Sequence, residues 1–297
     1  MQKIVPNLWF DHEAVEAATF YTTVFDNSKI NWKTVIKDTP SGDSEQISFT
    51  LEGLDIFAIS AGPIFTLNPT GSFSIFCETE EEVEDLWEQL IAGGTVIMAL
   101  DRYPFSNRYG WVKDRFGLSW QLMHVDYPFK QKIYPTLTFV GKQYLKAEEA
   151  RTHYVSIFKE AEMGDIFYYG EEAEDENPKA VSYSSFTLEG VTHLAMDMMT
   201  SDDSYFFNEA FSLMVSCEDQ AEIDYYWEKL STVPEAEECG WLKDKFGISW
   251  QIMPREMDEM MQSTDEEAKA RVVEAFLKMK KIDIAALNAA YAGEVVE

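Results

Sequence analysis

The feature that most constrains this chain is an internal duplication. The segment GWVKDRFGLSWQLM at Gly110–Met123 returns as GWLKDKFGISWQIM at Gly240–Met253, with ten identical positions among 14 and four conservative exchanges. Weaker copies lie upstream in the same order. Self-similarity of this kind is the signature of a duplicated folding unit. We therefore predict two homologous domains, at 1–127 and 128–255, followed by a helical tail at 256–297.

Four weaker pairs of segments support the duplication. They are KIVPNLWF (from Lys3) with KIYPTLTF (from Lys132), FYTTVF (Phe20) with HYVSIF (His153), SFTLEG (Ser48) with an identical copy (Ser185), and WEQL (Trp87) with WEKL (Trp227). The displacement grows from 132 − 3 = 129 to 227 − 87 = 140 and then falls to 240 − 110 = 130. This drift places small insertions and deletions in the loops between the matching segments.

Composition limits the possible partners. The 297 residues hold 24 Lys and Arg against 53 Asp and Glu, a formal net charge of −29. Such a surface repels polyanions, so neither nucleic acid nor an anionic membrane is an expected partner. The longest uncharged stretch, Ile56–Cys77, contains Gly62, Pro63 and Pro69, and it is therefore predicted to be strand, turn and strand rather than a membrane span.

The predicted compartment is the cytoplasm. The first residues hold neither an apolar run of signal-peptide length nor a small-residue cleavage site. Three cysteines, Cys77, Cys217 and Cys239, form no CxxC pair and cannot all pair within one chain. Unpaired cysteines are typical of a reducing compartment.

Hydrophobic periodicity predicts the order βαβββ, written twice in each repeat. Apolar residues of the first repeat follow a helical period over Glu13–Phe25, and a helix with an acidic start is predicted over Glu80–Leu90. Strands are predicted at Ile4–Phe10, Ile30–Ile36, Gln46–Leu51, Asp55–Ser60, Ser72–Cys77, Thr95–Leu100, Tyr109–Lys113 and Leu118–His124.

The tail carries the signals of two helices. Thr264 with Glu267 forms a capping-box pattern before an apolar stripe that ends at Met279. A second helix is predicted over Ile284–Ala292, ended by Gly293. Both helices either pack on their own domain, or they provide a dimer contact or a lid over one pocket.

The KDRFG and KDKFG segments are predicted to be hairpin turns. Asp114 and Gly117, like their counterparts in the second repeat, stand at the two ends of four residues. In such a turn the aspartate bonds the backbone and the glycine relieves strain, so Asp114 and Asp244 are interpreted as turn residues rather than catalytic acids.

The segments PNLWFDHEAVEAATFYTTVF, SFTLEG, the WE-L helix end and GW-KD-FG-SWQ-M resemble the PhnB-like branch of the vicinal oxygen chelate superfamily. That superfamily includes glyoxalase, bleomycin resistance protein and extradiol dioxygenases. Members of the branch often carry the label 3-demethylubiquinone-9 3-methyltransferase, yet this chain has no glycine-rich strand-to-helix turn suited to a nucleotide-like methyl donor.

The resemblance implies an α+β vicinal oxygen chelate fold. Paired βαβββ modules are expected to form a cupped sheet in each repeat, with helices outside and a ligand cavity inside. The two tandem domains are expected to form a pseudo-dimer within one chain, and a further homodimer remains possible.

Metal-using members of the superfamily hold a divalent ion with His and Glu side chains on the first and last strands of their modules. By resemblance, Gln121 and Gln251 occupy the glutamate position. The first strands carry Asn7 and Trp9, or Thr136 and Thr138, in place of histidine. A neutral amide supplies no charge to hold a divalent cation, so no metal and no cofactor are predicted.

Strand alternation selects the predicted pocket residues. If Gln121 faces the cavity, Ser119 and Met123 do too, while Trp120 and Leu122 face the helices. His193 is the one histidine on a predicted pocket strand, and it is interpreted either as a ligand contact or as a locally hydrogen-bonded core residue. The predicted ligand-binding set is Asn7, Trp9, Ser119, Gln121, Met123, Thr136, Thr138, His193 and Gln251.

A pocket of Asn, Thr, Gln, Trp, Phe and Met suits a neutral, partly aromatic or amphipathic small molecule held by a few hydrogen bonds. The predicted function is therefore binding of a small organic molecule, with no catalytic residue assigned and enzymatic activity left open. The first alternative is a metal-dependent lyase, isomerase or dioxygenase that uses Gln121 or Gln251 and water. The second is a non-catalytic scaffold whose cups are filled by side chains.

Overall fold

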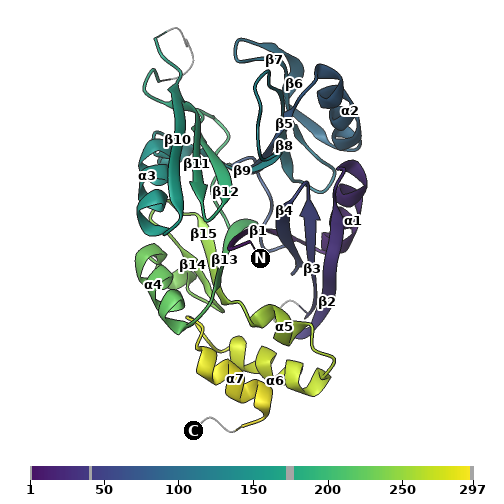
Figure 1. The fold of residues 1–297 in the computed structure, drawn as a ribbon, viewed down its shortest axis with the longest axis vertical. Coiled ribbons are helices and arrows are strands. Elements are labelled where there is room, and N and C mark those ends of the chain that lie inside the picture. Colours follow the sequence, from purple (N-terminus) through teal and green to yellow (C-terminus); the bar gives the residue numbers. More distant parts are fainter. Residues whose placement is uncertain (1, 40–41, 172–176, 295–297) are drawn as a thin grey trace.

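The computed structural model describes residues 2–39, 42–171 and 177–294, and its strands form two curved sheets (Figure 1). The described residues of the first repeat form two helices and eight strands: β1 (Ile4–Phe10), α1 (Ala14–Val24), β2 (Lys29–Thr39), β3 (Gly42–Leu51), β4 (Leu54–Ser60), β5 (Gly71–Cys77), α2 (Glu80–Ile91), β6 (Thr95–Tyr103), β7 (Ser106–Lys113) and β8 (Ser119–His124). These elements confirm the predicted order βαβββ, written twice.

The second repeat follows the same plan with one strand fewer in its described residues. Its elements are β9 (Ile133–Phe139), η1 (Gly141–Gln143), α3 (Ala147–Ile157), β10 (Ala161–Tyr168), β11 (Val181–Leu188), β12 (Val191–Asp197), β13 (Phe211–Cys217), α4 (Gln220–Leu230), η2 (Pro234–Ala236), β14 (Trp241–Lys243) and β15 (Ser249–Pro254). The tail adds α5 (Met257–Met261), α6 (Glu266–Phe276) and α7 (Ile284–Ala292). No helix in the described ranges is long and apolar enough to cross a membrane.

Each sheet combines one module from each repeat. The seven-strand sheet has the order β14-β15-β13-β1-β4-β3-β2, and the eight-strand sheet has the order β10-β11-β12-β9-β5-β8-β7-β6. The repeats meet where β1 pairs antiparallel with β13 and where β5 pairs antiparallel with β9. The expectation of one cup within each repeat is therefore wrong, because both central strand pairs join different repeats.

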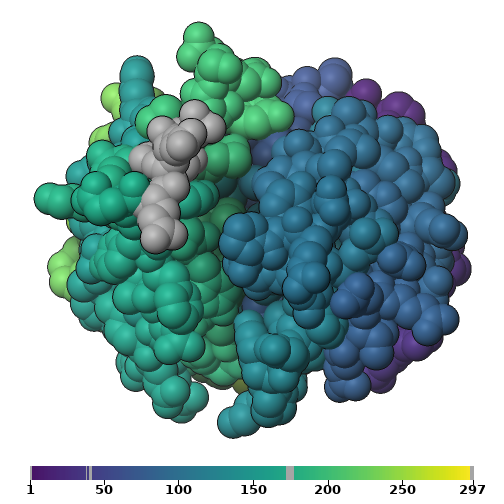
Figure 2. Space-filling model, turned by 90° about the horizontal axis from the view of Figure 1, so that it is seen from above, coloured from purple at the N-terminus to yellow at the C-terminus, as the bar shows by residue number. Residues whose placement is uncertain are grey.

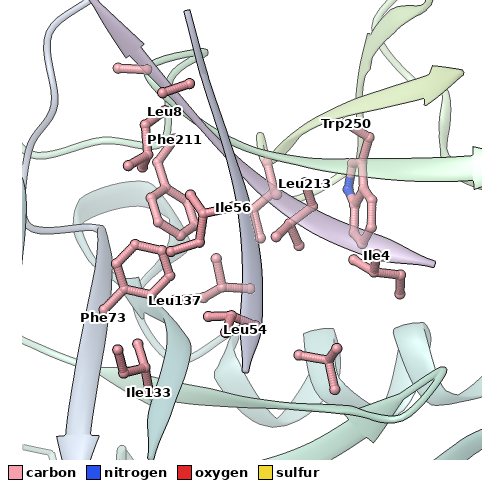
Figure 3. Packing of buried hydrophobic residues seen from close by; sticks show 14 of the residues in the cluster. Ile4, Leu8, Leu54, Ile56, Phe73, Ile133, Leu137, Phe211, Leu213 and Trp250 are labelled. Carbon is pink, nitrogen blue, oxygen red and sulfur yellow. The ribbon is translucent and has the colours of Figure 1, made fainter. Parts of the chain in front are cut away.

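The two sheets lie back to back at their centres, and their concave faces point in opposite directions (Figure 1). Buried side chains from both sheets meet in one core, in which Leu8, Ile56 and Phe211 of one sheet approach Phe73 and Leu137 of the other (Figure 3). The approach is close: a Cβ atom on Gly71 would lie 2.3 Å from the Phe211 ring. We call the two concave faces the seven-strand cup and the eight-strand cup.

The KD-FG turns confirm the predicted role of their aspartates. Asp114 Oδ1 accepts the backbone N–H groups of Phe116 and Leu118, and Gly117 adopts the left-handed conformation, with φ of 90°. Asp114 Oδ2 also accepts from Tyr21 Oη and Trp120 Nε1, at 2.7 and 2.8 Å. Because Tyr21 lies on a helix over the seven-strand sheet and Asp114 follows an eight-strand-sheet strand, this buried bond ties the two sheets together.

The second repeat reproduces this arrangement. Asp244 accepts from the backbone of Phe246 and Ile248, and from Tyr154 Oη and Trp250 Nε1 at 2.6 and 2.9 Å. Burial raises the pKa of both aspartates, and the four donated hydrogen bonds oppose that rise.

The tail lies beside the seven-strand cup. The two predicted tail helices are present, and α7 ends at Gly293 with φ of 75°, as predicted. The predicted capping box is wrong, because Asp265 rather than Thr264 caps α6 and accepts the N–H of Ala268. The unpredicted helix α5 contacts the first repeat through a hydrogen bond from Thr34 to the backbone of Met261. The tail therefore contacts both repeats.

The strand missing from the second repeat is the counterpart of β6. Between α4 and β14, a range that the structure describes in full, the chain forms only the short turn η2. The backbone N–H groups of Cys239 and Gly240 donate instead to Met279 and Lys280 of the tail, at 2.8 and 2.7 Å. The tail thus supplies part of the hydrogen bonding that a β6 counterpart would give.

Candidate functional site

Alternation along the strands places the predicted polar residues on the concave faces. Trp120 and Leu122 belong to the main core cluster, whereas Gln121 between them faces the eight-strand cup. Trp250 and Ile252 likewise lie in the core around Gln251. The predicted facing of these strands is therefore confirmed.

The seven-strand cup joins Asn7 and Gln251, which come from different repeats. Both amides converge on one hydroxyl: Asn7 Nδ2 lies 3.3 Å and Gln251 Nε2 lies 3.0 Å from Ser212 Oγ. This arrangement turns the two amide carbonyl oxygens away from Ser212. In the described part of the chain neither carbonyl has a donor, and the Asn7 oxygen is fully buried.

Aromatic side chains line the rest of the seven-strand cup. Trp9, Trp32 and Trp241 are all partly exposed, and all pack on a small apolar cluster that contains Phe57. The Trp9 ring lies 6.2 Å from Trp241 between centroids, and its Nε1 donates to the backbone of Gly62 at 2.7 Å. This hydrogen bond holds the Trp9 ring in one orientation. Trp241 pairs with Gln251 across β14 and β15, so the cup offers aromatic surface beside the Gln251 amide.

The eight-strand cup holds the equivalent glutamine in a closed network. Gln121 Nε2 donates to Ser72 Oγ at 3.1 Å, as Gln251 does to Ser212. Here, however, Tyr109 Oη donates to Gln121 Oε1 at 2.9 Å. The residue equivalent to Tyr109 in the second repeat is Cys239, which has no phenol to donate. Gln121 is therefore satisfied by its own protein, and Gln251 is satisfied only in part.

Further hydrogen bonds and aromatic packing fill the eight-strand cup. Thr136 Oγ1 lies 2.8 Å from Ser74 Oγ. Phe76 packs against Tyr134 at 4.5 Å between ring centroids, and Tyr127 and Phe129 of the segment between the repeats pack on Phe76 as well. Figure 2 looks onto this side of the molecule, where the blue surface of the first repeat meets the teal surface of the second. The linker between the repeats thus covers one end of this cup.

The remaining predicted pocket residues of the eight-strand cup fall into two groups. Ser119 and Thr138 are fully buried, and their hydroxyls have no hydrogen-bond partner in the described ranges. Met123 is partly exposed and lines a cavity of about 330 Å³ at the end of this cup. Met123 thus reaches a cavity.

His193 does not face either cup. It is fully buried, its ring stacks on core residue Phe186 at 5.6 Å between centroids, and its Nδ1 donates to the backbone of Val191. Burial lowers the pKa of His193 from 6.5 to about 4, which keeps the imidazole neutral. The structure therefore places His193 with the core-facing residues, and the apolar Ile56 at the equivalent position of the first repeat is the sequence signal for this placement.

The side chains that converge in the cups do not fit a divalent metal ion. The donors are amides and hydroxyls, namely Asn7, Gln251 and Ser212 in one cup and Gln121, Ser72 and Thr136 in the other. The described residues contain no group of three or more His, Cys, Asp or Glu that could hold a metal. Neutral amide and hydroxyl oxygens bring no charge to balance a divalent ion, so on their own they are poor ligands for it.

Sequence reasoning missed three residues whose contacts define the two cups. Ser212, Tyr109 and Trp241 were not in the predicted set, although each makes a defining contact. The signal for Tyr109 was available, because it lies two residues before the shared Trp and its counterpart is Cys239.

Comparison with known proteins identifies relatives over most of the chain. The family model described as 3-demethylubiquinone-9 3-methyltransferase matches residues 2–123 and again residues 131–253. A structure titled as a putative 3-demethylubiquinone-9 3-methyltransferase, PhnB protein, from Bacillus cereus shares 36% identity. It covers 42% of this chain and 100% of its own, with a TM-score of 0.39. No protein of curated function matches the chain.

Two more distant structures cover both repeats at once. Glyoxalase I from Zea mays shares 9% identity and covers 86% of this chain and 95% of its own, with a TM-score of 0.53. A putative dioxygenase from Bacillus subtilis shares 12% identity over 88% of this chain and 89% of its own, with a TM-score of 0.51. These likenesses show the vicinal oxygen chelate fold with two tandem units, which form a pseudo-dimer within one chain.

Proposed function

Since the chain belongs to the 3-demethylubiquinone-9 3-methyltransferase family, a branch of the vicinal oxygen chelate superfamily, we propose that it binds a small neutral aromatic molecule in the seven-strand cup, without a metal ion. The observation that carries the proposal is the Gln251 carbonyl, which has no donor among the described residues and lies opposite Trp241, next to the Trp9 ring. A pocket of this kind uses aromatic faces for affinity and a few polar atoms for orientation.

The chemistry of the cup defines the ligand class. The Gln251 amide group that bonds Ser212 is the donor, so its free oxygen accepts, and the matching ligand group is an O–H or N–H. Trp9, Trp32 and Trp241 favour a planar ring system, which gains stacking contacts as well as burial. We assign the eight-strand cup a structural role, because its glutamine is already satisfied.

The family name describes a methyl transfer, and we do not extend that activity to this chain. Its cups contain no described residue set for a metal, and its sequence lacks a glycine-rich turn for a nucleotide-like methyl donor. A cytoplasmic location is part of the proposal, supported by three free, buried thiols. A further homodimer of the chain also remains a proposal, which its mass in solution would test.

The test is isothermal titration calorimetry with 2-naphthol, a planar neutral probe with one O–H donor. The expected result is one site per chain, about tenfold tighter for 2-naphthol than for 2-methoxynaphthalene, which has no donor. Removal of divalent metals with EDTA is expected to leave the affinity unchanged.

Matched variants locate the site. Gln251→Leu is expected to abolish the preference for 2-naphthol over its methyl ether, and Gln121→Leu is expected to leave the preference intact. Circular dichroism checks that both variants fold. Equal effects of the two substitutions, or binding that requires a metal, would overturn the proposal.

A further inference from the structure

A cavity outside the proposed binding cup lies at the outer end of the eight-strand sheet. Its volume is about 330 Å³, and it is lined by two segments, Arg102–Asn107 at the β6–β7 hairpin and Met123–Tyr127 after β8. We call it the hairpin cavity. Because the second repeat lacks a counterpart of β6, the described part of that repeat has no equivalent of the hairpin.

Aromatic rings form one wall of the hairpin cavity. Tyr103 and Phe105 stack with 5.6 Å between centroids and 18° between planes, and both meet Tyr109 edge-on. Phe105 is 61% exposed and Tyr127 is 50% exposed, although both line the cavity. Large aromatic side chains held in place at the surface of a cavity provide a ready surface for a planar ring.

Opposite charges line the same cavity. Arg102 and Asp126 are among the residues that line it, one in each segment. Among the described residues, neither forms an ion pair. A guanidinium is suited to a carboxylate ligand group, and a carboxylate to an ammonium group. The cavity therefore presents one partner for each charge of a zwitterion, beside an aromatic wall.

We propose that the hairpin cavity binds a small aromatic zwitterion of the size of an aromatic amino acid. The ring packs on Phe105 and Tyr127, the carboxylate meets Arg102, and the ammonium group meets Asp126. A ligand with a single negative charge gains one ion pair and meets the repulsion of Asp126, in a protein whose formal net charge is −29. The cavity volume is at the lower end of small-ligand sites, which suits one ring with a short side chain.

The test compares three probes by calorimetry on the full chain. They are L-phenylalanine, L-phenylalaninamide, which lacks the carboxylate, and 3-phenylpropionate, which lacks the ammonium group. L-Phenylalanine is expected to bind about tenfold more tightly than either analogue, since each charged contact contributes independently. Equal affinity for all three probes, or no saturable binding of L-phenylalanine, would contradict the proposal.

Charge-removing variants assign each contact. Arg102→Gln is expected to remove the preference for L-phenylalanine over its amide. Asp126→Asn is expected to remove the preference for L-phenylalanine over 3-phenylpropionate, because the carboxylate that binds the ammonium group and repels the anion is lost. Arg115→Gln is the matched control, because Arg115 is partly exposed over Phe20 and lies outside the cavity. Trp9→Ala separates the two proposals, since it is expected to weaken 2-naphthol and not L-phenylalanine. A loss of L-phenylalanine binding in the Arg115 or Trp9 variant would place the site elsewhere.

Discussion

The two cups are built from equivalent segments, yet they differ in how open they are. Trp111 is 1% exposed in the eight-strand cup, whereas its counterpart Trp241 is partly exposed in the other. The fully buried Thr138 corresponds to the partly exposed Trp9. Two local differences accompany this: β6 pairs with β7 beside Trp111, whereas β14 is the end strand of its sheet in the described residues, and Tyr109 bonds Gln121. After duplication, one copy of a site can therefore become part of the core while the other keeps partly exposed aromatic rings.

The largest expected effect concerns the KD-FG turn, which has the same contacts in both repeats. Asp114→Asn leaves the buried donors of Tyr21 and Trp120 facing an amide N–H₂ group instead of a carboxylate oxygen. We expect a loss of about 3 kcal/mol in the free energy of unfolding, because a buried charged network loses acceptors. Urea denaturation followed by circular dichroism measures this.

The matched variant is Asp244→Asn, whose carboxylate makes the same four contacts. The two losses are expected to agree within about 1 kcal/mol, the usual spread between equivalent sites. A clear difference would show that the two turns do not contribute equally to holding the sheets together.

A second prediction uses a position where the repeats differ, His193 in one and Ile56 in the other. Because burial lowers the folded-state pKa of His193 to about 4, the unfolded chain binds a proton at higher pH than the folded chain does. The stability that depends on neutral His193 is present above pH 6.5 and is lost as the pH falls toward 4. This loss amounts to roughly 2–3 kcal/mol at pH 4.

His193→Ile is expected to remove that part of the pH dependence, measured as unfolding free energy at several pH values between 7 and 4. His12→Asn serves as the control, because the His12 side chain is 78% exposed. If the pH dependence of the His193→Ile variant matched that of the wild type, the buried imidazole would not be the group responsible.

A third prediction concerns a variant in which the seven-strand cup resembles the eight-strand cup. Trp9→Thr installs the residue that stands at the equivalent position of the second repeat, Thr138. The affinity for 2-naphthol is expected to fall about tenfold, since a stacking surface is lost. The reciprocal variant Thr138→Trp is expected to leave the affinity unchanged, because that cup is filled.

The smallest expected effect comes from a variant in which the eight-strand cup resembles the seven-strand cup. Tyr109→Phe removes the donor to Gln121 Oε1 and frees that carbonyl, as Gln251 is free in the other cup. We expect a loss of about 1 kcal/mol in unfolding free energy, the typical net value of one hydrogen bond. Thermal unfolding measures the change, and an unchanged stability would indicate that the two glutamines differ for another reason.

The sequence determined much of this protein by itself. The spacing of apolar residues along the chain identified the strands and helices of each module, because this spacing shows directly which face of an element is buried. The duplicated motif fixed two equivalent turns, and the facing of Gln121 and Gln251 followed from alternation alone. These features are local, so a few neighbouring residues contain the information.

Only the tertiary structure decided which modules share a cup. The same strand sequence can pair with a module of its own repeat or of the other, and nothing in its local pattern distinguishes the two. The choice rests on contacts between distant residues, such as Gly71 against Phe211 and the β1 pairing with β13. For that reason Asn7 is expected beside Gln121 and lies instead beside Gln251, where both amides bond Ser212 and neither carbonyl has a donor among the described residues.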